Sequence, residues 1–224
     1  MTFQVPSTST RNLLDQACRI YEKDLKGSVA EKYLLKRGLT KEVMTYFRLG
    51  YVDPSVDRFP GHEFQENRLA IPYITPTGIV QMRFRAVPFD GEIGGPEDSP
   101  KYKSIAHTSV TMFNTRDFAS EGTIAVCEGE LDAISAHMAG IPAIGIPGAS
   151  NWQKVFARAF RFRKVVILAD NDDKGDGLKF AEKVQADIKG SRIILMDEGY
   201  DVNKFIQDFG IQELRKKVGL KDDS

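Results

Sequence analysis

The sequence predicts an α/β protein in which an α+β N-terminal part is followed by a parallel sheet flanked by helices. Residues 11–47 carry apolar side chains at helical spacing, residues 51–118 read as short strands and turns, and from residue 123 apolar strands alternate with helices. Such alternation is typical of parallel sheets. We expect a polar mobile arm over residues 1–10, an α+β part over residues 11–119 and the parallel-sheet domain over residues 120–224.

Three helices are expected at the start of the first part. The first begins at Arg11, the second covers residues 28–37 and the third covers residues 40–47. Ser28 and Thr40 are suited to cap the second and third helices, because a hydroxyl oxygen can accept a free backbone N–H of the first turn. A hairpin follows, with strands over residues 68–74 and 79–87 joined by a turn, and then a surface loop over residues 88–100.

The second part alternates strands and helices to its end. Residues 165–168 are all apolar, which suits a strand that is buried on both faces. The expected strands are residues 123–127, 142–146, 164–169 and 192–196, and the expected helices are residues 131–139, 152–160, 178–188 and 202–217.

Composition excludes several classes of protein. The 224 residues include two cysteines and three histidines, so a disulfide framework and a four-cysteine zinc site are not expected, and we expect no zinc. No apolar run approaches the roughly 20 residues that span a bilayer, and the first residues lack the pattern of a secretory signal. We therefore expect no membrane association and a cytoplasmic location.

The charge balance argues against a uniform electrostatic hold on DNA. The chain has 31 basic and 31 acidic residues. Residues 154–164 nevertheless carry five basic side chains and no acid. This segment is either a solvated helix face or a local basic surface, and charge alone does not decide between them.

Acidic residues follow the expected strands at the point where each strand ends. Glu128 follows the first strand, Asp170 and Asp172 follow the third, and Asp201 follows the fourth. Since the carboxyl ends of parallel strands meet at one edge, we expect these side chains to converge there. Clustered carboxylates repel one another, and a hard divalent cation such as Mg²⁺ or Mn²⁺ removes that repulsion.

These acids have two other interpretations. Acids after strands can simply cap the helices that follow; this is a serious alternative for Asp132 or Asp176 alone and a weaker one for the whole set. Residues 170–175 also resemble the start of an EF-hand loop, but Lys174 and Ala181 occupy the positions where that loop requires oxygen ligands, so we reject it.

The acidic motifs resemble the TOPRIM domain of DnaG-type primases, topoisomerases and some nucleases. The similarity rests on Glu-Gly-Glu-Leu-Asp-Ala at 128–133, Gly-Ala at 148–149 and Asp-Asn-Asp-Asp-Lys-Gly at 170–175. The first half resembles the catalytic core of DnaG-type primases through Tyr-Leu-Leu-Lys-Arg-Gly-Leu-Thr at 33–40, Arg-Leu-Ala-Ile-Pro at 68–72 and Pro-Lys-Tyr at 100–102. The resemblance covers residues 11–218, and within this family the sequence is most similar to phage primases. Topoisomerases and OLD-type nucleases lack the first half, so its presence argues against them.

This resemblance implies a DNA primase, a DNA-directed RNA polymerase that joins ribonucleoside triphosphates on single-stranded DNA with Mg²⁺ or Mn²⁺. It assigns Asp170, Asp172 and Asp201 as metal ligands, Glu128 as a ligand or the general base, and Asp132 as a member of the same catalytic cluster. Arg68, Arg83, Arg85 and Lys101 match basic positions that hold template phosphates or triphosphate. Charged residues at alternate positions of an exposed strand are the other interpretation of Arg83 and Arg85.

The sequence departs from the typical bacterial pattern in several places. It shows no zinc ribbon and no helicase-binding domain, Lys103 and Ser104 stand where an asparagine is usual, and the late motif is Asp-Val-Asn at 201–203. We therefore expect a separate zinc-ribbon protein and a replicative helicase as partners. Two alternatives stay open: a catalytically weak accessory module that binds single-stranded DNA or a helicase, and a TOPRIM nuclease.

Overall fold

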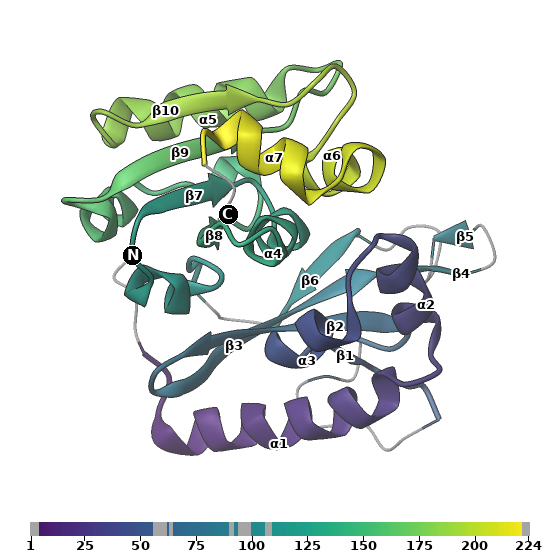
Figure 1. The fold of residues 1–224 in the computed structure, drawn as a ribbon. Helices are drawn as coiled ribbons and strands as arrows, with labels where there is room; N and C mark the ends of the chain where they lie inside the picture. The colour runs from purple at the N-terminus through teal and green to yellow at the C-terminus, as the bar shows by residue number, and fades with distance from the viewer. Residues whose placement is uncertain are drawn as a thin grey trace. The chain divides into compact units, whose positions relative to one another are not determined.

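The computed structural model describes residues 5–55, 62, 65–89, 92–93, 100–105 and 109–220. The chain forms two compact units, residues 1–109 and 110–224. The first contains an antiparallel sheet and the second a parallel sheet with helices (Figure 1), which confirms the predicted fold class. No helix in the described part of the chain is long and apolar enough to cross a membrane.

The first unit begins with three helices, α1 (Thr8–Leu25), α2 (Val29–Lys36) and α3 (Lys41–Tyr46). Helix α1 starts inside the stretch that the sequence analysis assigned to an arm, because the Ser7 hydroxyl accepts the N–H of Thr10. Ser28 and Thr40 cap α2 and α3 as predicted. The Glu31 carboxylate accepts the N–H of Gly27 at 2.7 Å instead of completing a standard capping box.

A four-stranded antiparallel sheet follows in the order β1-β2-β3-β6. Its strands are β1 (Gly50–Tyr51), β2 (Arg68–Thr75), β3 (Gly78–Ala86) and β6 (Tyr102–Ser104). Helix α1 packs on one face, where Leu14 and Tyr21 meet Met82 and Phe84. Most of the loop expected over residues 88–100 lies outside the described residues; its described part includes the short pair β4 (Pro88–Phe89) and β5 (Glu92–Ile93).

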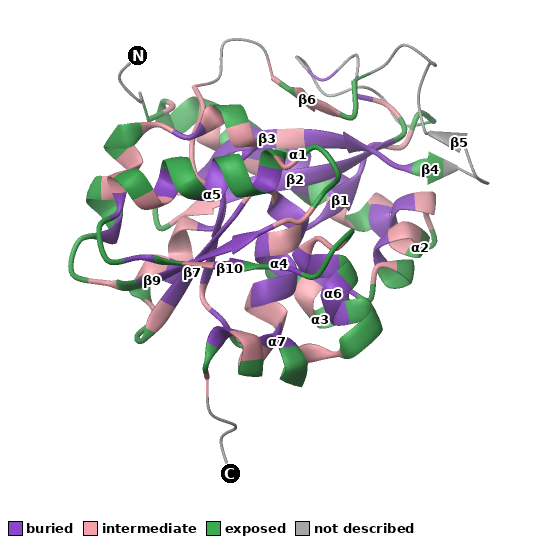
Figure 2. Cartoon of the chain, turned by 90° about the horizontal axis from the view of Figure 1, so that it is seen from above, coloured by how far each residue is buried: buried purple, intermediate pink, exposed green. Residues whose placement is uncertain are grey.

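The second unit contains the predicted parallel sheet, in the order β10-β9-β7-β8. Its strands are β7 (Thr123–Cys127), β8 (Ala143–Gly145), β9 (Lys164–Ala169) and β10 (Arg192–Leu195). Apolar side chains of α5 (Asp176–Asp187) cover one face. Helix α4 (Glu130–Met138) covers the other, beside α6 (Val202–Phe209) and α7 (Ile211–Val218). Figure 2 shows β7 and β9 as largely buried strands.

Residues 110–119, expected in the first part, make their hydrogen bonds within the second unit. Phe113 forms an isolated bridge with Gly145, and the Asn114 side chain donates to the carbonyl of Ala143 at 2.9 Å. The short 3-10 helix η1 (Thr115–Ala119) places Asp117 so that its carboxylate accepts the N–H of Ala143 at 2.8 Å. This segment therefore extends the edge of the parallel sheet beside β8.

The predicted helix over residues 152–160 is wrong in type and extent. The structure has two 3-10 helices there, η2 (Ala149–Asn151) and η3 (Lys154–Phe160). Side-chain contacts fix both ends of the segment, since the Trp152 indole donates to Asp187 at 2.9 Å and the Phe160 ring packs 5.0 Å from that of Phe118. These tertiary contacts, together with the tighter 3-10 winding, replace the predicted α-helix.

Candidate active site

Glu128 and Asp170 stand at the ends of two neighbouring strands. In the parallel pair β7–β9, Cys127 lies opposite Leu168, so Glu128 directly follows one strand and Asp170 follows the other one residue further on. The chain leaves β7 toward β8 and leaves β9 toward β10, on opposite sides. This reversal is the point at which open α/β sheets form ligand sites.

Asp170 lies in an environment that disfavours its negative charge. Burial raises its pKa to about 9, and the charges of Asp132, Asp201, Glu128 and Asp172 add to the effect. Its Oδ1 atom is buried and accepts no hydrogen bond within the described part of the chain. A carboxylate at this position therefore favours a neighbouring positive charge.

Asp172 is exposed and forms the turn into α5. Its Oδ1 atom accepts the backbone N–H of Lys174 at 2.8 Å and that of Asp176 at 3.3 Å. Desolvation opposes ionisation, but the N–H groups of Asp176, Lys174, Gly177 and Gly175 outweigh it and lower the pKa of Asp172. This carboxylate is therefore ionised and partly engaged in shaping its own loop.

Asp201 caps helix α6. Its Oδ1 atom accepts the N–H of Lys204 at 2.6 Å. The capping interpretation of acids after strands is thus correct for one oxygen of Asp201. Its negative charge nevertheless helps to raise the pKa of Asp170, so the same side chain belongs to the acidic group at the sheet edge.

Asp132 joins two helices of the second unit. It lies in the first turn of α4, and its Oδ1 atom accepts the backbone N–H of Asn203 in α6 at 3.2 Å. The fully buried Asn203 side chain donates to the Ser135 hydroxyl at 2.8 Å and accepts from Gln207 at 2.8 Å. Asp132 therefore helps to fix the start of α6, where Asp201 lies.

Asn171 is a site residue that sequence reasoning did not single out. Its backbone N–H donates to the carbonyl of Tyr200 at 3.0 Å, and its carbonyl accepts the N–H of Gly199 at 2.8 Å. Its side chain donates to the carbonyl of Met196 at 3.0 Å. These bonds attach the Asp170 loop to the loop after β10. The sequence signal that could have identified Asn171 is its position as an amide between two acids, Asp170 and Asp172.

Two glycines allow the backbone to close tightly around the acids. A Cβ atom at Gly177 would lie 2.3 Å from the carbonyl oxygen of Asp170, and one at Gly145 would lie 2.8 Å from that of Gly129. Real Cβ atoms do not approach so closely, so both positions require glycine. The N–H of Gly148 also donates to the carbonyl of Glu128 at 3.2 Å, which places the turn after β8 against the first acid.

The donor set suits a hard cation, although its side chains are not arranged around one. Within the described ranges, no three His, Cys, Asp or Glu side chains are grouped so as to hold a metal ion. One carboxylate oxygen in each of three acids already accepts a backbone N–H: Asp172, Asp201 and Asp132. The bare, buried Oδ1 of Asp170 and the all-oxygen chemistry of the cluster fit the divalent metal that Toprim and primase folds imply in general.

The predicted basic residues of the first unit divide between the two faces of its sheet. A regular hairpin would place Arg68 opposite Arg85, but a bulge between Tyr73 and Ile74 shifts the register and places Arg68 opposite Ala86. Because successive strand residues face opposite sides, Arg68 lies on the face that α1 covers, whereas Arg83 and Arg85 lie on the other. Sequence alone did not show this separation.

Arg83 and Arg85 gather around aromatic rings. Their Cζ atoms lie 4.5 Å and 5.0 Å from the centre of the Tyr102 ring, and Arg85 also lies 5.7 Å from that of Tyr33 in α2. Arg85 donates to the Tyr102 hydroxyl. It is 8% exposed, so it is not an ordinary solvated strand residue. The alternative interpretation is therefore wrong for Arg85.

Arg68 is almost fully buried and donates to the carbonyl of Pro100 at 3.0 Å. Its charge adds to desolvation in lowering the pKa of Lys103, a basic residue that the sequence analysis recorded only as a departure. Lys101 is exposed beside them. The structure thus brings together Arg83 with Arg85, and Arg68 with Lys103, as two separate basic groups.

Comparison with known proteins identifies relatives of both halves. A sequence profile described as Toprim-like matches residues 125–206. The chain is 34% identical over 157 residues to the Gene 57 protein of Mycobacterium phage D29, a match that covers 67% of this chain and 97% of that protein. It is 28% identical over 240 residues to the DNA primase of Aquifex aeolicus, covering 92% of this chain but 48% of that protein. The chain thus spans about half the length of this bacterial relative.

Solved structures share the fold at low identity. The RNA polymerase domain of Mycobacterium tuberculosis primase DnaG aligns with a TM-score of 0.77 at 20% identity, over 96% of this chain and 84% of that one. A DnaG primase catalytic domain bound to single-stranded DNA aligns with a TM-score of 0.73 at 21% identity, over 93% of this chain and 77% of that one. These likenesses extend over both units.

Proposed function

This chain belongs to the DnaG-type primase family with a Toprim-like domain, and we propose that it synthesises short RNA primers on single-stranded DNA. The observation that carries the proposal is the placement of Glu128 and Asp170 at the ends of adjacent strands, with the charges of three further acids reaching Asp170. The reaction joins the 3′-hydroxyl of one ribonucleotide to the α-phosphate of the next, and pyrophosphate leaves.

Asp170 and Glu128 are the residues best placed to hold Mg²⁺ or Mn²⁺, with Asp172 and Asp201 as further ligands. When bound, a divalent ion supplies Lewis-acid activation of the hydroxyl and neutralises charge on the leaving pyrophosphate. Glu128 serves either as a ligand or as the base that accepts the hydroxyl proton. Asp132 acts through Asn203, because their hydrogen bond fixes the helix that Asp201 caps.

The first unit supplies cations for phosphate groups. Two tyrosine rings hold the Arg85 guanidinium, whose buried Nε atom has no hydrogen-bond partner among the residues that the structure describes. A guanidinium fixed in this way loses little freedom when it binds a phosphate of the template or of an incoming triphosphate. We assign the same role to Arg83 and, on the other face, to Arg68, Lys101 and Lys103.

A second candidate follows from the arrangement of the acids. Because no three ligand side chains in the described part of the chain are already grouped for a metal, an accessory module that binds single-stranded DNA or a helicase without synthesis is the alternative. The acidic cluster weighs against it, since clustered negative charge repels DNA phosphates. A separate zinc-ribbon protein and a replicative helicase are the partners we propose for the active enzyme.

Primer synthesis on unprimed single-stranded DNA tests the proposal. The chain is incubated with four ribonucleoside triphosphates and Mg²⁺ or Mn²⁺, with and without a zinc-ribbon protein, beside Glu128→Gln, Asp170→Asn and the exposed control Glu182→Gln. Short RNA products that only the two site variants lose support a primase. Metal-dependent shortening of the template instead indicates a nuclease, and DNA binding without product under every condition indicates the accessory module.

A further inference from the structure

The basic segment 154–164 forms part of a hollow on the second unit that the proposed reaction does not use. The hollow has a volume of about 540 Å³, and its lining includes Lys154, Arg158, Arg161, Phe162, Arg163 and Lys189. Sequence reasoning left this segment open between a solvated helix face and a local basic surface. In the structure the segment is a 3-10 helix followed by a turn, and four of its five basic side chains line the same hollow as Lys189, which favours a local basic surface.

Most of these cations have no structural task. Arg163 is the exception, since its guanidinium donates to the carbonyls of Phe118 at 2.9 Å and Ser120 at 2.7 Å. The other basic residues of the surface are exposed, and none forms an ion pair or side-chain hydrogen bond within the described residues: Lys154, Arg158, Arg161, Lys164 and Lys189. The one acid in the lining, Asp187, accepts the Trp152 indole N–H at 2.9 Å. The surface is thus strongly positive.

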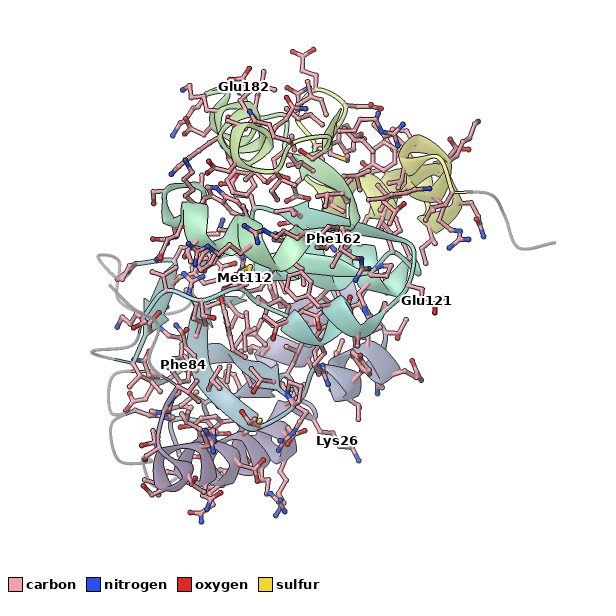
Figure 3. The ribbon with its side chains drawn as sticks, turned by 90° about the vertical axis from the view of Figure 1, so that its left-hand side faces the viewer. Lys26, Phe84, Met112, Glu121, Phe162 and Glu182 are labelled. Atoms are coloured by element: carbon pink, nitrogen blue, oxygen red, sulfur yellow. The ribbon has the colours of Figure 1, made fainter. Side chains whose placement is uncertain are left out.

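Phe162 lines the hollow together with these basic side chains. It is fully exposed, whereas Phe160, two residues earlier, is buried in the core. Its backbone has φ of 64°, a left-handed conformation that costs an ordinary residue roughly 1 kcal/mol or more. Figure 3 labels the residue on the face presented in that view. A strained backbone that holds an aromatic ring in water, among unpaired cations, indicates a ligand for that ring.

We propose that this basic surface binds single-stranded DNA, with phosphates on the free cations and a base stacked on Phe162. Stacking on an aromatic ring within a positive groove is the usual way in which proteins hold unpaired strands. Duplex DNA keeps its bases stacked internally, so it offers nothing to the ring. An acidic peptide would satisfy the cations, but a fully exposed ring suits a flat base better than an aliphatic side chain that needs a walled pocket.

The surface is separate from the acidic edge. Lys164 begins β9 and Asp170 follows its end, so six residues at about 3.3 Å each put roughly 20 Å between them along the strand. DNA held here avoids the carboxylates that repel its phosphates. The proposal concerns binding alone and does not depend on the proposed primer synthesis, although it gives a primase a second hold on its template.

Fluorescence anisotropy with the whole chain tests this. The probe is labelled oligothymidylate of about a dozen nucleotides, within the usual site size, without nucleotides or divalent metal. Phe162→Ala should weaken binding about fivefold or more, which is the low end for loss of one stacked base, and Phe162→Trp should restore it. Because Phe162 is fully exposed, its removal opens no cavity in the core.

The double variant Arg158→Ala/Arg161→Ala should reduce the slope of log affinity against log salt by about 1.4, since each phosphate contact to a single strand contributes about 0.7. Lys23→Ala/Lys26→Ala is the matched control, because it removes one exposed charge from the last turn of α1 and one from its C-cap (Lys26 is labelled in Figure 3). It should leave affinity within about twofold of wild type.

Three outcomes would overturn the proposal: surface variants that match the control, an abasic strand that binds as tightly as oligothymidylate, or polyglutamate that competes as well as DNA. The assay contains no nucleotides and no divalent metal, so it measures binding separately from synthesis. A chain that binds through Phe162 but makes no primers would therefore refute the proposed function and leave this inference intact.

Discussion

The Asp132 carboxylate accepts the backbone N–H of Asn203 at 3.2 Å across 71 positions of sequence. The same asparagine donates its side chain to the Ser135 hydroxyl one turn further along α4. Two adjacent turns of α4 therefore hold the first turn of α6, and Asp201 at its cap is fixed relative to Asp170. Asp132, which the sequence predicts to be in the catalytic set, therefore also helps to hold α6 in place.

Asn203→Ala should destabilise the chain by about 1–3 kcal/mol, because it leaves buried hydrogen-bonding groups without their partner. Thermal unfolding measures the change. Gln207→Ala is the comparison variant, since it removes one donor to Asn203 but keeps the bond from Asn203 to Ser135, and it should cost less than Asn203→Ala. Equal unfolding temperatures for the two variants would show that Asn203 does not hold the helices together.

Gly177→Ala should damage the site although alanine is normally favourable in a helix. The new Cβ atom would lie 2.3 Å from the Asp170 carbonyl oxygen, so the loop must shift, at a cost of about 1–3 kcal/mol. Gly190→Ala is the control, because its positive φ gives it a conformational cost of its own while nothing lies within 4 Å of the added Cβ atom. Primer synthesis should be lost only in Gly177→Ala; retained synthesis there would contradict the close packing.

Mg²⁺ should raise the unfolding temperature of the chain, because an ion that binds only the folded state stabilises it by mass action. Asp170→Asn should abolish this response, since it removes the buried anionic oxygen. Glu182→Gln removes an exposed carboxylate from α5 and should respond like wild type. A Mg²⁺ response that survives in Asp170→Asn would place the cation elsewhere on the chain.

Arg48→Met should cost about 2 kcal/mol at neutral pH, because Arg48 makes charged hydrogen bonds to Asp15 at 2.6 Å and Glu22 at 2.8 Å. The control Arg19→Met removes the more exposed partner of Asp15 and should cost less than about 1 kcal/mol. The comparison tests whether the Arg48 network fastens α1 to the turn before β1.

The Arg48 effect should depend on pH. The hydrogen bond from Arg48 lowers the pKa of Asp15 in the folded chain. A lowered pKa stabilises the folded state above the unfolded value of about 3.9, and this stability is lost as pH falls through the folded value. The difference between wild type and Arg48→Met in chemical denaturation should therefore shrink below about pH 4; a difference that stays constant would contradict the ion pairs.

The parallel sheet and its acidic edge could be predicted because both follow from local pattern. The apolar run in β9 fixes a buried strand, and the strand fixes where Asp170 emerges. The faces of the basic residues could not be predicted, since one bulge at Tyr73 decides that Arg68 and Arg85 lie on opposite sides. The role of Asp132 was equally hidden, because its partner Asn203 is distant in sequence and donates from the backbone.

The acids at the ends of β7 and β9 are the proposed centre of nucleotidyl transfer. The most direct measurement is the rate of ribonucleotide incorporation on single-stranded DNA by wild type, Asp170→Asn and Glu182→Gln at saturating Mg²⁺. We expect Asp170→Asn to lose a hundredfold or more, on the order seen when one charge-stabilising group leaves an active site, and Glu182→Gln to match wild type. Incorporation by Asp170→Asn at the wild-type rate would contradict the account.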